Sequence, residues 1–161
     1  MDFNSLNHWQ QLAVCAAMTE RSFPNYGLYC ELAQTGEPKT VRKMLNKVWE
    51  YLRGQLKSLK NIESQLEQLE PLIPDVESTE NYGAFLAMDV TVALQSCLQS
   101  ILDNSILDAD AITTMMRERL QEVLEMQEAE VNSHELWQRH SEFEQTLFDL
   151  MGLNISHAEA I

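Results

Sequence analysis

Asp89 is the residue whose type and position most clearly point to chemistry. Its neighbours one helical turn away, Phe85, Val92 and Ala93, are all apolar. A carboxylate in such surroundings must be paired, hydrogen-bonded or protonated. Asp89 is therefore either an acid or base lining a pocket, or a structural carboxylate bound to a tyrosine hydroxyl, an arginine or a helix-end amide. We favour the structural role, since buried polar networks often lack catalytic function, and we expect a buried side chain with at least one hydrogen bond.

His140 is the second candidate catalytic residue. It stands on a helical stripe with the apolar residues Leu136, Phe143 and Leu147. A histidine in that setting is more often a satisfied core or interface residue than an acid or base catalyst. No carboxylate stands at its i+3 position, so we expect no local partner to orient the ring.

Charge is unevenly distributed along the chain. The net charge is −14; residues 1–60 carry 8 basic and 5 acidic residues, whereas residues 61–161 carry 3 basic and 20 acidic residues. Four basic residues share one side of a predicted helix and are called the basic stripe: Lys39, Arg42, Lys43 and Lys47. The basic stripe could track phosphates, but the overall negative field repels nucleic acid and anionic lipid. Nucleic-acid binding is therefore not expected.

The acidic row, defined as Glu118, Glu122 and Glu125, repeats at i, i+4 and i+7 of a later predicted helix. It could pair with the basic stripe within one subunit, between two subunits, or not at all. Acidic helices repel one another unless something basic lies against them, so we predict a homodimer in which the basic stripe of one subunit lies near the acidic row of the other. The alternative is a monomer whose acidic surface keeps it dispersed.

The sequence contains none of the common motifs for binding a metal, a cofactor or a nucleotide. The sequence has no Glu-x-x-His motif, no histidine pair at i and i+4, and no G-x-G-x-x-G, G-x-x-x-x-G-K-[ST] or G-x-S-x-G loop. Helical di-iron and zinc sites, nucleotide-binding folds and many hydrolases depend on those patterns. We therefore expect neither a metal site nor a cofactor.

Three cysteines, Cys15, Cys30 and Cys97, lie far apart without a C-x-x-C pair. This pattern favours buried thiols in a reducing cytoplasm over a disulfide framework. No basic residue precedes the apolar run Leu12–Met18, as a secretory signal would require. The uncharged run Val90–Leu102 has 13 residues, fewer than the ~20 that cross a bilayer. We expect neither a leader nor a membrane span.

Apolar residues recur with helical spacing over nearly the whole chain, and no segment alternates with period two. The pattern predicts seven helices, over residues 5–21, 24–34, 38–53, 61–73, 82–103, 110–131 and 133–151. Pro24 is expected to separate the first two, because proline disfavours the α conformation at the preceding residue. The stretch 82–103 is apolar on most sides, which predicts the central helix.

A length of 161 residues is that of one ordinary domain. The expected architecture is all-α: a single-domain, orthogonal or bundle-like array of about seven helices around the central apolar helix. This domain covers residues 1–152, and residues 153–161 are expected to form a loose carboxyl-terminal tail.

Several short phrases, taken in order, resemble the YjaG-like bacterial proteins, a family catalogued as a domain of unknown function. They run over about residues 3–103 and include Trp9-Gln10-Gln11, the phrase from Arg21 to Tyr26, the stretch from Val48 to Leu52, Ile73-Pro74-Asp75, Tyr82-Gly83 and Ala87-Met88-Asp89. The resemblance implies a small, all-helical, soluble bacterial protein. It brings no catalytic residues.

The acidic charge and the lack of a catalytic constellation favour one functional class. We expect a soluble, non-enzymatic cytoplasmic protein that acts by protein contact or self-association. The alternative is a small-molecule binding protein or enzyme that uses the buried Asp89 in a pocket within the helical domain. Nucleic-acid binding through the basic stripe ranks last.

Overall fold

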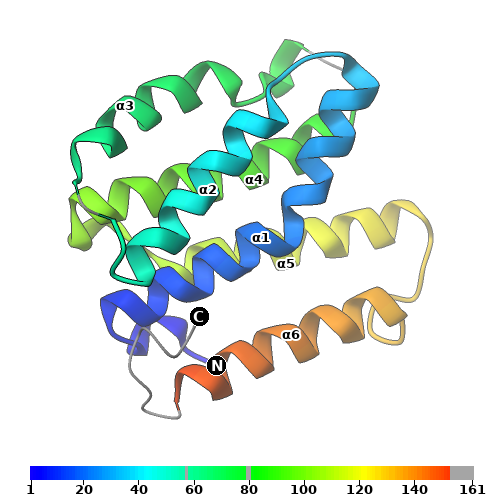
Figure 1. Ribbon diagram of the computed structural model, residues 1–161. Coiled ribbons are helices and arrows are strands. Elements are labelled where there is room, and N and C mark those ends of the chain that lie inside the picture. The colour runs from blue at the N-terminus through cyan, green and yellow to red at the C-terminus, as the bar shows by residue number, and fades with distance from the viewer. Residues whose placement is uncertain (57, 79–80, 153–161) are drawn as a thin grey trace.

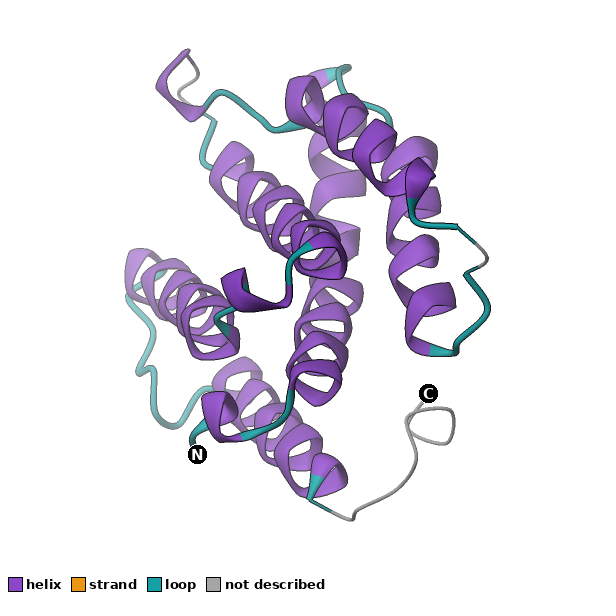
Figure 2. Cartoon of the chain, turned by 90° about the vertical axis from the view of Figure 1, so that its left-hand side faces the viewer, coloured by secondary structure: helices purple, strands orange, loops and turns teal. Residues whose placement is uncertain are grey.

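The computed structural model describes residues 1–56, 58–78 and 81–152 of the chain. Over these residues it contains helices and loops but no strand (Figure 2). Six α-helices form the fold: α1 (His8–Ala33), α2 (Pro38–Leu52), α3 (Lys60–Leu69), α4 (Gly83–Leu102), α5 (Ala109–Met126) and α6 (Glu135–Met151). Short 3₁₀ turns include η1 (Phe3–Ser5), before α1, and η2 (Glu70–Leu72) and η3 (Val76–Ser78), between α3 and α4. The predicted all-α class is confirmed, and the predicted tail, 153–161, lies outside the described residues.

The predicted break at Pro24 is wrong, because α1 runs through it as one helix of 26 residues. Proline removes the N–H that would bond the Glu20 carbonyl, and this loss usually bends or ends a helix. Here both sides of the proline are anchored, since Thr19 and Tyr26 are fully buried. The ribbon of α1 bends instead of ending (Figure 1). The described residues therefore form six α-helices rather than the predicted seven.

Helices α1 and α4 form the central pair, around which the other helices are arranged (Figure 1). Helices α2 and α5 each pack on both α1 and α4, make no substantial contact with each other, and so lie at opposite corners of the array. Helix α3 packs on α4, and α6 packs on α1 and α5. The six helices form a single domain. Helices α1 and α4 lie between α2 and α5, so the exposed surface of α2 is separate from that of α5.

Helix α4 is the central apolar helix that the sequence predicts. Its fully buried side chains include Val90, Leu94 and Leu98, and burying each side chain of this kind contributes roughly 1.5 to 3 kcal/mol. By length and hydropathy alone α4 could cross a membrane. In this fold α1, α2, α3 and α5 pack around it, so it is a core helix.

Side chains at helix starts explain several boundaries. Asp108 caps α5 by accepting a backbone N–H, and α6 begins after His134, whose imidazole accepts a backbone N–H in the same way. The predicted seventh helix, residues 133–151, thus begins two residues later than expected, at Glu135. Helix α3 begins at Lys60, one residue before the predicted start at residue 61.

The three cysteines are buried and unbridged, as predicted. Cys15 and Cys30 both belong to α1, because that helix is continuous, and Cys97 belongs to α4. Burial raises the pKa of each thiol. A thiol that is buried and protonated is a packing group rather than a nucleophile.

Replacing Gly36 with alanine is expected to destabilise the fold more than the same change at Gly54. Both glycines have positive φ, 79° and 73°, which costs alanine about 1 to 2 kcal/mol. A Cβ at Gly36 would also lie 2.5 Å from Cys30 Sγ and 2.9 Å from the Tyr26 hydroxyl oxygen, whereas a Cβ at Gly54 meets nothing within 4 Å. Urea unfolding should show an additional loss of about 1 kcal/mol or more for Gly36→Ala. Equal losses would show that the loop relaxes around the new methyl group.

Candidate functional site

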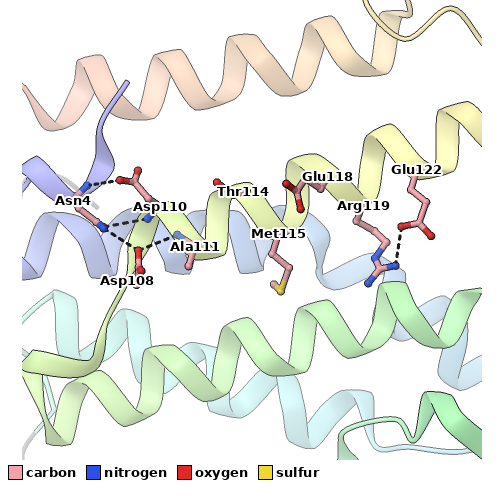
Figure 3. Close-up of a pocket in the computed structure, with 9 residues that line it drawn as sticks. All are labelled: Asn4, Asp108, Asp110, Ala111, Thr114, Met115, Glu118, Arg119 and Glu122. Carbon is pink, nitrogen blue, oxygen red and sulfur yellow. Dashed lines mark hydrogen bonds and ion pairs between the residues drawn. The ribbon is translucent and has the colours of Figure 1, made fainter.

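A groove of about 550 Å³ lies along one side of α5. Figure 3 shows the residues that line it: Asn4, Asp108, Asp110, Ala111, Thr114, Met115, Glu118, Arg119 and Glu122. Two members of the acidic row, Glu118 and Glu122, are among them. Four lining side chains are carboxylates and one is a guanidinium, so the groove is acidic.

Hydrogen bonds between η1 and the start of α5 hold one end of the groove (Figure 3). The Phe3 N–H donates to Asp110 at 2.8 Å, and the Asn4 side-chain amide donates to Asp108 at 2.9 Å. The Asp110 N–H donates to the Asn4 side-chain oxygen at 3.2 Å. The bond from Asn4 lowers the pKa of Asp108 below its ordinary value. The carboxylates at this end are therefore fixed in place, and the lowered pKa of Asp108 favours its ionised form.

Helical spacing positions the middle of the groove. Ala111, Met115, Glu118 and Glu122 are separated by four, three and four residues, so they share one face of α5. Glu118 and Glu122 are exposed. Met115 places an apolar side chain between carboxylates, so the groove can contact both the charged and the aliphatic parts of a basic side chain.

Asp89 is bound to the groove residue Arg119. The aspartate is 4% exposed, and its two oxygens accept from Arg119 Nε at 2.8 Å and Nη2 at 3.3 Å. The Arg119 guanidinium carbon also lies 5.1 Å from the centre of the Phe85 ring, and the guanidinium donates to Glu122 at 3.2 Å. The predicted burial and hydrogen bonding of Asp89 are confirmed, with arginine as the partner.

Opposing effects act on the Asp89–Arg119 pair. Burial raises the pKa of Asp89 above its ordinary value, and the hydrogen bond from Arg119 opposes that rise. The same hydrogen bond raises the pKa of Arg119. Burial is thus the larger effect on the pKa of Asp89, and the hydrogen bond is the larger effect on the pKa of Arg119. Two parallel hydrogen bonds between a guanidinium and a carboxylate favour the ionised pair. Because Asp89 belongs to α4 and Arg119 to α5, this pair joins the two helices.

His140 belongs to a second polar junction, between α5 and α6. Its Nε2 lies 2.7 Å from one carboxylate oxygen of Glu144, and the other oxygen accepts from Arg117 at 3.0 Å. The expectation that His140 lacks a local partner is wrong, because a residue at i+4 shares a helix face as a residue at i+3 does. Glu144 is buried. Burial would raise its pKa, but the hydrogen bonds from His140 and Arg117 lower the pKa below its ordinary value of 4.5.

The two candidate catalytic residues lie apart. Asp89 is at the boundary of α4 and α5, His140 is at the boundary of α5 and α6, and different arginines hold the two junctions. His140 lines a cavity of about 180 Å³, whereas Asp89 lines neither that cavity nor the groove. Within the described part of the chain, no three His, Cys, Asp or Glu side chains are grouped to hold a metal ion. Asp89 and His140 do not form one acid–base pair.

The basic stripe on α2 is partly engaged within the chain. Arg42 donates to the two oxygens of Glu20 at 2.5 and 2.6 Å, and the Trp49 indole donates to the same carboxylate at 3.1 Å. Lys47 pairs with Glu50 at 3.2 Å. Arg42 therefore joins α2 to α1, and it is not available as a free surface cation.

Lys39 and Lys43 are the exposed members of the basic stripe, and neither has an ion-pair partner among the described residues. Glu125, the third member of the acidic row, is exposed as well and accepts from the Gln121 side chain at 3.0 Å. Because α2 and α5 occupy opposite corners, the basic stripe and the acidic row do not meet within one chain.

Sequence reasoning missed three partners in these junctions: Arg119, Glu144 and Glu20. The sequence could have predicted Glu144 as a partner, because it follows His140 at i+4 on the same helix face. It could not have predicted the other two partners, because Arg119 is 30 residues from Asp89 and Glu20 is 22 residues from Arg42. Only the packing of whole helices brings those partners together.

Removing the Asp89 carboxylate is expected to destabilise the protein. Asp89→Ala leaves the Arg119 guanidinium without its main partner, which should lower the free energy of unfolding by about 1 to 3 kcal/mol. The matched control is Glu135→Ala, which breaks an exposed i,i+4 pair with Arg139 and should cost roughly 0.5 kcal/mol or less. Urea unfolding measures both. Equal losses would contradict the structural role of Asp89.

Acid is expected to weaken the junction that contains Glu144. A carboxylate whose pKa is lowered by folding contributes stability above its ordinary pKa and loses that contribution as the pH falls through the lowered value. Glu144→Gln should therefore be less stable than the natural protein at neutral pH, and the difference should shrink below pH 4.5. Urea unfolding from neutral to acidic pH measures this difference. A difference that is constant with pH would exclude an ionic contribution from Glu144.

Comparisons with solved structures support the fold. A crystal structure of a DUF416 family protein from Shewanella baltica OS155 superposes with a TM-score of 0.86 at 25% sequence identity. The superposition covers 98% of this chain and 86% of that protein. The six-helix arrangement therefore recurs in a related bacterial protein.

Sequence comparisons identify the relatives. The uncharacterized protein YjaG of Escherichia coli K12 is 30% identical over 154 residues, which cover 91% of this chain and 78% of that protein. An uncharacterized protein of Haemophilus influenzae is 41% identical over 106 residues; that match covers 65% of this chain and spans only about half, 53%, of the relative. A family model described as "Protein of unknown function (DUF416)" matches residues 2–159. The chain therefore belongs to the DUF416 family, as its resemblance to YjaG-like proteins predicts.

Proposed function

We propose that this chain acts by contact with another protein and that the groove along α5 is the contact surface. The observation that carries the proposal is the composition of the groove, which has four carboxylates against one guanidinium in about 550 Å³. The guanidinium belongs to Arg119 and is committed to Asp89 and Glu122. A basic segment of a partner is therefore the complementary occupant.

A second copy of the chain provides such a basic segment. Lys39 and Lys43 are exposed on α2, and they are one helical turn apart, as Glu118 and Glu122 are on α5. At ~1.5 Å per residue both pairs span about 6 Å along their helices. This match supports contact between the basic stripe of one subunit and the acidic row of another.

The positions of the two surfaces bear on the symmetry of such an assembly. A two-fold dimer requires one self-complementary face, whereas surfaces on opposite corners associate head to tail. The basic stripe and the groove lie at opposite corners. A homodimer formed by this contact would therefore leave one basic stripe and one groove open, and it would grow further as the protein concentration rises.

The alternative function, a binding protein or enzyme that uses Asp89, has weaker support. Both Asp89 oxygens are hydrogen-bonded to Arg119, so the carboxylate is occupied by a structural partner. The other ionisable groups at the helix junctions likewise hold helices together. This role favours a protein that acts by contact with another protein over an enzyme. Buried, unbridged cysteines suit the reducing cytoplasm, where we place the protein.

Self-association is expected to depend on salt. Raising the ionic strength from about 0.01 M to about 1 M shortens the Debye length from about 30 Å to about 3 Å, so the average mass in sedimentation should fall toward that of a monomer. Lys39→Glu combined with Lys43→Glu should abolish association at low salt. Adding Glu118→Lys and Glu122→Lys to the same chain should restore it, because the charges are exchanged.

Lys60→Glu is the matched control, since Lys60 is exposed on α3 and outside both surfaces. It should associate as the natural protein does. A monomer at low salt and high protein concentration would refute self-association. An assembly that is insensitive to salt would refute its electrostatic cause.

A further inference from the structure

A cavity of about 180 Å³ lies where α1, α5 and α6 meet. These three helices all pack on one another (Figure 1). Helix α1 contributes Arg21, Ser22 and Asn25, which stand on either side of Pro24 in the sequence. The cavity shares no lining residue with the groove of α5, so it is a separate site.

Apolar side chains form one part of the cavity wall. Met18 of α1 is 1% exposed and Met116 of α5 is 8% exposed. Leu120 and Leu136 also line the cavity, and Leu136 is a large apolar side chain that remains 48% exposed. Covering this wall removes apolar surface from water, which favours a ligand with an alkyl group.

Arg21 supplies the positive charge of the cavity. Its guanidinium carbon lies 4.5 Å from the centre of the Phe143 ring, a contact made through the face of the guanidinium. Among the described residues Arg21 has no carboxylate partner, whereas Arg42, Arg117 and Arg119 each have one. Its N–H groups, which bind a carboxylate in the plane of the guanidinium, are therefore open to a ligand.

His140 forms a polar wall whose ring is held from outside the cavity. Its Nε2 lies 2.7 Å from Glu144, so Nδ1 is the ring nitrogen without a hydrogen-bond partner among the described residues. Glu144 is paired in turn with Arg117 at 3.0 Å, which compensates its charge. No carboxylate belongs to the described residues that line the cavity. The polar part of the wall is therefore suited to an anion.

The acidic row of α5 is turned away from this cavity. Met116 and Leu120 line the cavity, whereas Glu118 and Glu122 line the groove. Side chains two residues apart point about 200° apart around a helix of 3.6 residues per turn. The helix therefore lies between these carboxylates and the cavity, and salt at about 0.1 M screens more distant charges over ~10 Å. An anion can bind here although the net charge is −14.

We propose that this cavity binds a small carboxylic acid with a short alkyl chain. The carboxylate is held by the guanidinium of Arg21 and the side-chain amide of Asn25, and the alkyl chain packs against Met18, Met116 and Leu136. An apolar cavity of about 150 Å³ holds a benzene molecule. The volume of about 180 Å³ therefore suits an acid slightly larger than benzene, such as isocaproate.

A titration of the full chain, labelled with ¹³C at its methionine methyl groups, tests the proposal. Isocaproate should produce saturable shifts of the Met18 and Met116 methyl signals at constant ionic strength. Met44 is buried on α2 and outside the cavity, so its signal is the internal reference and should not shift.

Matched compounds separate the charge from the alkyl chain. Isocaproamide, which has the same shape without the charge, should bind at least about tenfold more weakly than isocaproate, a difference of about 1.4 kcal/mol. Acetate, which has the charge without the chain, should be weakened at least as much, and isoamylammonium should not bind. Equal binding of the acid and the amide would overturn the proposal without requiring any variant.

Replacing Arg21 tests the assignment of the cation. Arg21→Gln should weaken isocaproate binding about tenfold or more. Arg53→Gln is the matched control, because Arg53 is also an exposed arginine without a carboxylate partner among the described residues, and it lies outside the cavity. Unchanged affinity in Arg21→Gln, or equal losses in both variants, would overturn the assignment.

A second variant serves in case Arg21→Gln disturbs the fold by losing the contact with Phe143. Asn25 is exposed, and Asn25→Asp places a like charge beside the ligand with almost no change in size. It should abolish isocaproate binding without weakening that of isocaproamide. Asn61→Asp, at an exposed position on α3, is the control and should bind isocaproate normally. Full binding by Asn25→Asp would overturn the proposal.

N-Acetylleucine distinguishes a free acid from the carboxyl terminus of a protein, since it carries the carboxylate on a peptide-like unit. If isocaproate binds and N-acetylleucine does not, the ligand is a free acid; if both bind, a protein terminus also fits. Binding of N-acetylleucine alone would overturn the proposal of a small free acid. If neither compound binds, the cavity is not a carboxylate site.

Discussion

The packing of α4 against α1 is the contact on which the other helices depend. Because α4 is enclosed, each polar group on it requires a partner inside the protein. The Thr91 hydroxyl donates to the Met88 carbonyl at 2.9 Å, and the Ser100 hydroxyl donates to the Cys97 carbonyl at 2.8 Å. Asp89 cannot be satisfied within its own helix and needs a cation from α5. The burial of α4 thus determines where α5 must lie and how it must be rotated.

The same kind of contact recurs at the other helix boundaries. Arg42 of α2 reaches the Glu20 carboxylate of α1, and Arg117 of α5 reaches Glu144 of α6. Glu144 is buried, so truncating Arg117 would strand its carboxylate. Arg42 and Glu20 are partly exposed, so their contact fixes the position of α2 on α1 with only a modest net contribution to stability. Ionisable side chains committed in this way are poor candidates for catalysis. The surfaces between the junctions remain available for binding.

The sequence predicted single-helix properties well and contacts between helices poorly. The burial of Asp89 followed from its apolar neighbours at i−4, i+3 and i+4, and the central place of α4 followed from its apolar sides. The identity of the Asp89 partner did not follow, because it depends on how α5 is rotated against α4. The continuity of α1 through Pro24 was missed for a related reason, since tertiary packing on both sides outweighs the local cost of the proline. The sequence likewise predicts Arg42 as a surface cation, whereas in the fold it is paired with Glu20 of α1.

Charge pairing inside the fold also explains which exposed surfaces keep a net charge. The amino-terminal third holds most of the basic residues, but Glu20 and Glu50 neutralise part of the basic stripe within the chain. On α5, by contrast, one arginine is shared between Asp89 and Glu122, and Glu118 has no such partner among the described residues. Part of the uncompensated negative charge of the folded chain therefore lies on the carboxylates of the groove.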